Sequence, residues 1–236
     1  MLDALCQALS LTLQPVAVWR GDVLPEGVPL AEPHGCIVPT LTAAAKGSPV
    51  AFGQDSVGCP GGRQGLGLTA EMPAYMACFL STGTGDRPGM AYKKDPDLAA
   101  YYLHHLPTPP PAKYVVFWPL DQLPQEVTPW SILFLVDPHR LSALVTLANF
   151  DRADGQGVEV RFGAGCAQAV LYSLCHAAAG EDVCTIGLTD PSARLHLEDG
   201  KLLSFSVPYR RCLALEEAVK DSFLVKGTWR AIQKRL

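Results

Sequence analysis

The sequence predicts a mixed α/β (α+β) fold in which helices pack outside a mixed sheet, within a single domain over residues 1–236. Short apolar runs typical of buried strands alternate with longer leucine- and alanine-rich runs at helical spacing. With 48% apolar and 18% charged residues, a chain of 236 residues can bury one large core or two small ones. Prolines between residues 107 and 111 form a stiff connector, which divides the domain into two halves, 1–106 and 112–236.

Helices and strands alternate in the first half. Leucines at positions 2, 5, 9 and 11 predict an amphipathic helix, which Pro15 ends. The alanine-rich run after Cys36 predicts a second helix, which Gly47 ends. The other elements expected here are strands over residues 16–19 and 50–52 and helices over 70–80 and 95–106.

The second half begins with two apolar strand runs and closes with a long helical run. Residues 158–162 and 202–207 alternate between apolar and polar side chains, as half-exposed strands do. Gly227 marks a break in the final helix. The elements expected are strands over 114–118, 132–136, 158–162, 183–188 and 202–207 and helices over 141–149, 166–179 and 213–236.

Charge and hydropathy exclude several classes of protein. The net charge is −4 and no basic run occurs, which argues against a nucleic-acid surface. The apolar stretches are too short for a membrane span, and residues 1–15 lack both a basic leader and a small-residue cleavage site. We therefore expect a globular cytoplasmic protein.

The eight cysteines are too few for a disulfide scaffold, and no Cys-x-x-Cys motif occurs. In a reduced cytoplasm such thiols are metal ligands, catalytic groups or small core residues. Because the compact zinc and ferredoxin motifs are missing, an iron–sulfur or zinc site must take its ligands from distant segments. Cys6, Cys78 and Cys184 lie in apolar runs and are interpreted as core residues.

A glycine-rich segment over residues 49–68 is the most unusual part of the chain. Glycine releases the backbone from the limits that a Cβ atom imposes, so the main chain can pass close to itself or to a bound group. Cys59 is the one thiol in this segment. The segment therefore suits a wrapped cofactor, a nucleophile or a closely packed turn.

A related pattern occurs twice. Gly35-Cys36 precedes an alanine-rich run, a short strand and then Cys-Pro-Gly-Gly-Arg at residues 59–63. Gly165-Cys166 precedes an alanine-rich run, an apolar run and then Asp-Pro-Ser-Ala-Arg at residues 190–194. This pattern predicts an internal duplication. A pseudo-twofold axis would then bring together Cys36, Cys59, Cys166 and Asp190.

Arg63 and Arg194 each follow the turn residue of their repeat, Cys59 or Asp190, by four positions. An arginine keeps its charge, so a partly buried one needs carboxylate, carbonyl or anionic partners. One interpretation is a surface arginine paired with a neighbour. The other is that both arginines point into a shared cleft, where they balance a negatively charged cluster or hold an anionic substrate.

Several motifs together resemble the uncharacterised ArCR family, also called domain of unknown function 169. They are the PVAV strand start, the Cys before an alanine-rich helix, the C-x-G-G-x-x-x-L-G segment, the later Gly-Cys helix and the closing S-V-P. The resemblance implies a cytoplasmic prokaryotic protein, often from anaerobes, and no settled reaction. It marks Cys36, Cys59, Cys166 and Arg194 as family-typical, and Cys6, Cys78, Cys175 and Cys212 as peculiar to this chain.

The leading hypothesis is an iron–sulfur protein that holds one [4Fe–4S] cluster through Cys36, Cys59 and Cys166. The fourth iron would bind Asp190, water or a substrate, which suits a redox or small-molecule-binding role. The partners expected are a small-molecule substrate or a redox protein; a homodimer is left open, and no catalytic residue is assigned. The expected cofactor-binding residues are Cys36, Cys59, Cys166, Gly61, Gly62, Arg63 and Arg194, with Asp190 as a further metal ligand.

Three alternatives stay open. Three cysteines with one aspartate or histidine also suit a structural zinc ion. A metal-free thiol enzyme or ligand-binding protein would use Cys59 or Cys36 as its nucleophile and needs a base within reach. In the third alternative every cysteine is simply packed in the core. The candidate bases are His34, His139, His176 and His196, and Cys212 is a spare ligand.

Overall fold

The computed structural model describes residues 1–33 and 35–236. Its centre is a seven-stranded mixed sheet in the order β2-β5-β1-β6-β9-β8-β7, in which β7 and β8 run parallel and the other neighbours run antiparallel. This arrangement confirms the mixed α+β prediction. The strands are β1 (Val16–Gly21), β2 (Val50–Phe52), β5 (Tyr114–Pro119), β6 (Ser131–Val136), β7 (Val158–Val160), β8 (Cys184–Gly187) and β9 (Leu203–Pro208), and a separate hairpin consists of β3 (Gly83–Thr84) and β4 (Arg87–Pro88).

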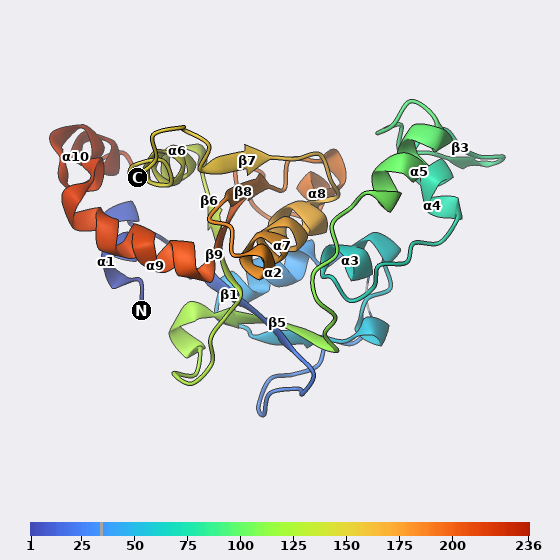
Figure 1. Cartoon of the computed structure of the whole chain (residues 1–236), viewed down its shortest axis with the longest axis horizontal. Coiled ribbons are helices and arrows are strands. Elements are labelled where there is room, and N and C mark those ends of the chain that lie inside the picture. The colour runs from blue at the N-terminus through green and yellow to red at the C-terminus, as the bar shows by residue number, and fades with distance from the viewer. Residues whose placement is uncertain (34) are drawn as a thin grey trace.

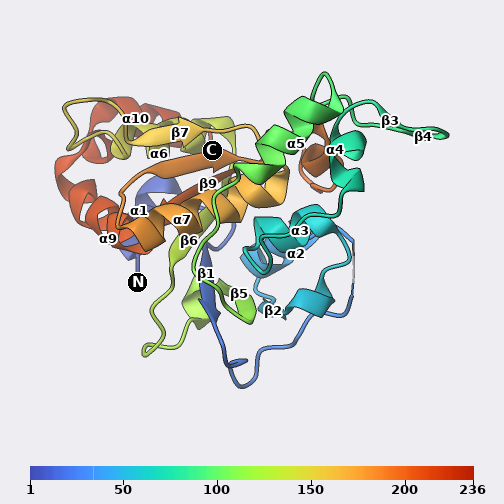
Figure 2. The same ribbon diagram turned by 45° about the vertical axis from the view of Figure 1, so that its right-hand side comes forward.

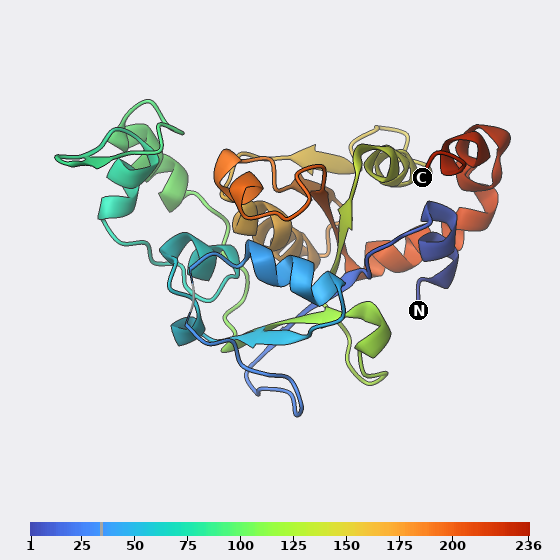
Figure 3. The same ribbon diagram turned by 180° about the vertical axis from the view of Figure 1, so that it is seen from behind.

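Helices cover both faces of the sheet (Figures 1 and 3). Those on one face are α1 (Asp3–Leu9), α6 (Pro138–Leu147), α9 (Tyr209–Ala218) and α10 (Gly227–Gln233). Those on the other are α2 (Val38–Ala45), α3 (Pro60–Gly65), α7 (Tyr172–Ala179) and α8 (Pro191–Leu195), and α7 is preceded by a π-helical segment over Ala167–Leu171.

The alternation of side chains along the strands produces two separate cores. On β1, Ala17 packs with the α1, α6, α9 and α10 layer, whereas Val16 and Val18 pack with the α2, α3, α7 and α8 layer. Successive residues of a strand point to opposite faces, so one apolar run supplies both cores. The second of these layers carries the candidate site.

The strand order is symmetrical about the β1–β6 pair. The group β2-β5-β1 on one side corresponds to β8-β9-β6 on the other, with antiparallel pairing throughout. A helix precedes the outer strand of each group, and a short helix, α3 or α8, follows it. A duplication would produce this order, although the duplication itself stays a prediction. Because β5 lies between β2 and β1, a boundary between β5 and β6 divides the sheet better than the connector at 107–111.

Several elements differ from their predicted bounds. The helix expected over 70–80 begins only at Tyr75, after Pro73, and forms α4 (Tyr75–Leu80). The helix expected over 141–149 begins at Pro138, because Asp137 caps it. The glycine-rich segment, expected to be a loop, forms the short helix α3 after Cys59. Cys212 lies inside α9 and is fully buried on the face opposite α3, so it is not a spare ligand.

Residues 72–106, which we call the cap segment, stand apart from the sheet at one end of the protein (Figures 1 and 2). The segment contains α4, the β3–β4 hairpin and α5 (Pro96–His104), and the side chain of Asp95 caps α5. Both chain termini lie toward the opposite end of the protein. Among the described residues, no helix has the length and apolar character that a membrane crossing requires.

The start of α6 supplies a test of the fold at low pH. Arg140 of α6 donates hydrogen bonds to the carbonyl oxygens of Leu9 and Ser10, and it also pairs with Asp137. Burial alone would raise the pKa of the Asp137 carboxyl, but hydrogen bonds from the backbone and side chain of Arg140 outweigh it and lower that pKa. A carboxyl with a lowered pKa stabilises the folded state above its unfolded pKa of about 3.9, and that stability is lost as the pH falls through the folded pKa.

We therefore expect Asp137→Asn to lower the free energy of unfolding by about 1 to 2 kcal/mol at pH 7. The difference from the wild type should shrink as the pH falls below about 4, where the wild-type carboxyl becomes neutral first in the unfolded state and then, at lower pH, in the folded state. Urea denaturation followed by circular dichroism between pH 2 and 7 measures both effects. The exposed Asp97→Asn serves as a control and should change little. A difference that is independent of pH would contradict the account.

Candidate functional site

Four residues from distant parts of the chain line one cavity of about 450 Å³. They are Cys36 before α2, Cys59 before α3, Cys166 before the π-helical segment and Asp190 before α8. The cavity extends from these helix starts to the cap segment, which closes its other side. The structure thus brings together the three thiols and the carboxylate that the repeated pattern singled out.

Cys166 is the most buried of the three thiols. Its Sγ donates a hydrogen bond to the carbonyl oxygen of Gly61, at 3.1 Å. Burial raises the pKa of the Cys166 thiol well above its usual range, and the nearby Cys59, Cys36 and Asp190 raise it further. The thiol is therefore protonated at neutral pH until a cation takes the place of its proton.

A close approach of two helices places Cys59 near Cys166. At Gly65, near the end of α3, a Cβ atom would lie 2.7 Å from Cys166 Sγ and 2.8 Å from the backbone nitrogen of Ala167. Only glycine fits there without a shift of the backbone. The π-helical segment itself is a rare conformation that occurs frequently at functional sites.

Cys36 and Cys59 also line the cavity, and both are partly buried. The backbone N–H of Val38, the first residue of α2, donates to Cys36 Sγ at 3.5 Å. Burial raises the pKa of the Cys36 thiol; the Val38 N–H lowers it, and Cys59 and Asp190 raise it. Both thiols thus face a cavity in which negative charge accumulates if they ionise.

One carboxylate oxygen of Asp190 accepts a hydrogen bond, and the other accepts none from the described residues. Oδ1 accepts a hydrogen bond from the backbone N–H of Ala193 at 3.0 Å and so caps α8. Oδ2 is buried and has no hydrogen-bond partner among the described residues. The residue is 6% exposed, and a buried polar atom without a partner costs free energy unless a ligand or water satisfies it.

The two predicted arginines bind backbone carbonyl groups and do not line the cavity. Arg63 Nε donates to the carbonyl oxygen of Val57 at 2.7 Å. Arg194 donates to the carbonyl oxygens of Leu188, Gly200 and Leu202. The geometry therefore differs from the sharper prediction, in which both point into the cleft, because carbonyls of their own loops satisfy them.

The two glycines assigned to the site have different positions. Gly61 lines the cavity and supplies the carbonyl that Cys166 binds. Gly62 is buried beneath it, where a Cβ atom would meet Val57 at 2.8 Å. Gly62 thus serves the packing of α3, and Gly61 alone contacts the cavity.

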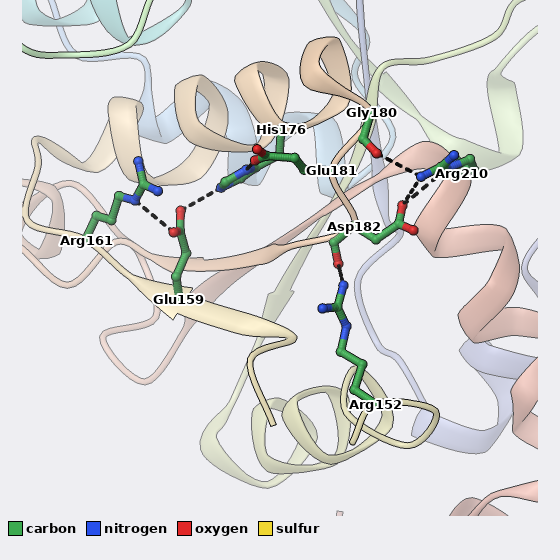
Figure 4. Close-up of polar contacts among 8 residues, drawn as sticks. All are labelled: Arg152, Glu159, Arg161, His176, Gly180, Glu181, Asp182 and Arg210. Carbon is green, nitrogen blue, oxygen red and sulfur yellow. Dashed lines mark hydrogen bonds and ion pairs between the residues drawn. The ribbon is translucent and has the colours of Figure 1, made fainter. Parts of the chain in front are cut away.

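The candidate bases are dispersed. His196 lines the cavity, whereas His139 is exposed at the start of α6 and His34 lies outside the described residues. Both ring nitrogens of His176 are bound by carboxylates, Glu181 at 2.6 Å and Glu159 at 2.8 Å (Figure 4). His176 therefore holds strand β7 against the end of α7 and is not free to act on a cavity thiol.

The remaining cysteines lie away from the cavity lining. Cys184 is fully buried, as predicted, on the α6 and α9 side of the sheet. Cys6 is partly buried and packs against the core on the α1, α6, α9 and α10 side, as its interpretation requires, whereas Cys78 is partly buried and differs from its interpretation as a core residue. Cys175 is also partly buried, and burial raises the pKa of its thiol to about 11.

A family model provides an independent comparison. The model of the uncharacterised ArCR proteins, domain of unknown function 169, matches residues 4–218 of the 236-residue chain. The chain belongs to this family. No curated protein and no solved structure matches it. Because the family is uncharacterised, membership supports the resemblance seen in the motifs and leaves the reaction to be argued from the site.

The sequence motifs do not indicate the apolar half of the cavity. Its lining comes from the cap segment, which carries three of the four methionines of the chain, Met72, Met76 and Met90. This clustering of flexible apolar side chains within twenty residues is a signal that the sequence contains. It indicates a site only once the cap segment is seen to fold over the thiols.

Gly65→Ala tests the helix contact that shapes the site. We expect it to lower the free energy of unfolding by about 1 to 3 kcal/mol, because the new methyl group overlaps Cys166 and backbone atoms. Gly61→Ala, in the same helix, is the matched control, since its Cβ would meet only Cys59 Sγ at 3.7 Å. Urea denaturation of the two variants should separate them clearly. Equal stability of the two variants would show that the contact between α3 and Cys166 does not require glycine at residue 65.

Proposed function

We propose that the cavity binds an iron–sulfur cluster of the [4Fe–4S] type through Cys36, Cys59 and Cys166, with Asp190 or an exogenous ligand at the fourth iron. One observation carries the proposal: three thiols and the largely buried carboxylate residue Asp190 line a single cavity. Thiolates are the ligands that such clusters take, and these come from three distant segments, as the absence of compact motifs requires.

The electrostatics of the cavity support a positively charged occupant of the thiol end. Among the described lining residues there is no lysine and no arginine. Ionised thiols and Asp190 would repel one another, and this mutual effect contributes to the raised pKa of Cys36 and Cys166. Metal ions displace the thiol protons and cancel the repulsion between the thiolates and the carboxylate. Metal binding therefore stabilises the folded protein.

The fourth position defines what the cluster could do. Three protein thiolates leave one iron for the Asp190 carboxylate, for water or for a substrate. Such a site supports electron transfer or the binding and polarisation of a small molecule. A cytoplasmic location, where thiols stay reduced, is part of the proposal.

The zinc alternative uses the same residues but needs them closer together. Tetrahedral zinc needs all of its ligands within about 2.0 to 2.3 Å of one ion. Among residues 1–33 and 35–236, no three histidine, cysteine, aspartate or glutamate side chains form a group that could hold a single ion as they stand. A cluster binds each thiolate to a different iron, so it accepts thiols that lie further apart.

A thiol enzyme is the second alternative. A nucleophilic cysteine needs its thiolate form, which an adjacent base or a lowered pKa supplies. Burial raises the pKa of Cys36 and Cys166, which argues against both as nucleophiles. Cys59 with His196 is the pair that this alternative retains, because both line the cavity.

The proposal predicts a brown protein after anaerobic reconstitution with iron and sulfide, containing about four of each per chain. Cys36→Ser, Cys59→Ser and Cys166→Ser should each lose most of the iron, the sulfide and the visible absorbance. Cys78→Ser and Cys175→Ser are matched controls and should retain them, because neither side chain lines the cavity.

Metal and acid-labile sulfide analysis decides the outcome. Zinc bound without sulfide would favour the zinc alternative. A colourless protein with neither metal nor sulfide would exclude the cluster. Fast iodoacetamide labelling of Cys59 alone at neutral pH would then support the thiol enzyme.

A further inference from the structure

The cavity is larger than the thiol site, and its outer part is apolar. The cap segment contributes an apolar wall, made of Met72, Met76, Leu80, Met90, Leu103 and Leu106. Met76 is buried by this packing, whereas Phe79, which also lines the cavity, is 44% exposed at its edge. Exposed and half-buried apolar side chains that converge on one cavity indicate a ligand surface.

We infer that the outer part of the cavity binds an uncharged, mainly apolar organic molecule whose one end reaches the thiols. The inference rests on the proposed function, because the group that this end of the ligand would contact is the proposed cluster. The whole cavity, thiol end included, has a volume of about 450 Å³, within the range of pockets that enclose small organic molecules. Methionine side chains adapt their shape to such ligands, which suits a wall that contains three of them.

The polar groups of the outer cavity are few, and most are already engaged. The hydroxyl of Tyr92 contacts Ser192 Oγ at 2.7 Å and accepts from the Ser192 backbone N–H at 3.0 Å. The hydroxyl of Tyr102 donates to the carbonyl oxygen of Phe162. These bonds hold the cap segment against the body of the protein. A ligand therefore gains most of its affinity from apolar contact.

Charge selects against an anionic ligand. Asp190 Oδ2 has no partner in the described part of the chain, and no lysine or arginine is among the described lining residues. A carboxylate or phosphate would enter an apolar cavity beside a second carboxylate, and no lysine or arginine of the described lining would replace its lost hydration.

Charge also selects against a cationic ligand at the cap. The ammonium group of Lys93 lies 4.3 Å from the centre of the Phe162 ring and 5.0 Å from that of Tyr102. Both rings line the cavity, so the cation already occupies the aromatic faces that would attract an amine. A neutral molecule avoids both conflicts.

A series of probes with the same hydrocarbon chain tests the inference: 1-octanol, octanoate and octylammonium. Binding to the full-length protein is measured under anaerobic conditions by saturation-transfer NMR and by calorimetry. We expect 1-octanol to bind the reconstituted protein at least about tenfold more tightly than either charged probe. Once the proposed cluster occupies the thiol end beside Asp190, neither probe charge finds a partner in the cavity, and an unpaired buried charge costs at least that much. Asp190→Asn keeps an oxygen that can cap α8 and removes the charge, so it should improve octanoate binding more than octanol binding.

Leu103→Trp fills the cavity from the cap segment and should abolish octanol binding. Tyr101→Trp is its control, because Tyr101 is 66% exposed on the same helix and does not line the cavity. Octanoate or octylammonium binding as tightly as octanol would overturn the inference, as would octanol binding that Leu103→Trp leaves unchanged. The probe series needs no variant, so its result stands even if Leu103→Trp fails to fold.

Iron and sulfide are determined on the same samples, which separates the two proposals. If octanol binds selectively to a protein that holds neither, the apolar ligand site is retained and the cluster is excluded. If the cluster assembles and no octanol binds, the cluster is retained and the apolar ligand site is excluded.

Discussion

The site depends on the close approach of α3 to the start of the π-helical segment that precedes α7. A side chain at Gly65 would overlap Cys166 Sγ and the backbone of Ala167, so the two helices meet only because residue 65 is glycine. The contact brings the carbonyl of Gly61 to Cys166 and holds Cys59 at the same cavity. Glycine permits a second close approach nearby, because a Cβ atom at Gly165 would lie 3.0 Å from Asp190 Oδ2.

This packing concentrates groups that are unfavourable together. Three thiols and one carboxylate share a cavity, while Arg63 and Arg194 are bound by carbonyls outside it. Ionised thiols beside this carboxylate would repel one another, which is why the proposed occupant of the thiol end is cationic. The methionines and leucines at the cap end are the basis for the inferred apolar ligand.

Much of the sheet was predictable, because its strands are short apolar runs bounded by glycine and proline, as at 114–119 and 131–136. The shared cavity of Cys36, Cys59, Cys166 and Asp190 followed from the repeated pattern. The helix formed by the glycine-rich segment could not be predicted, because tertiary packing overrides the low helix propensity of glycine. The apolar wall of the cavity could not be predicted either. Contacts between distant residues, such as Tyr92 with Ser192 one hundred positions later, bring the cap segment over the thiols.

The central claim is that one cluster occupies the space between Cys36, Cys59 and Cys166. A crystal structure of the anaerobically reconstituted protein, with diffraction recorded at the iron absorption edge, tests it most directly. The account predicts a single compact anomalous peak in the cavity, bounded by these three sulfur atoms and facing Asp190. A cavity without iron, or iron bound at other cysteines such as Cys6 or Cys175, would contradict it.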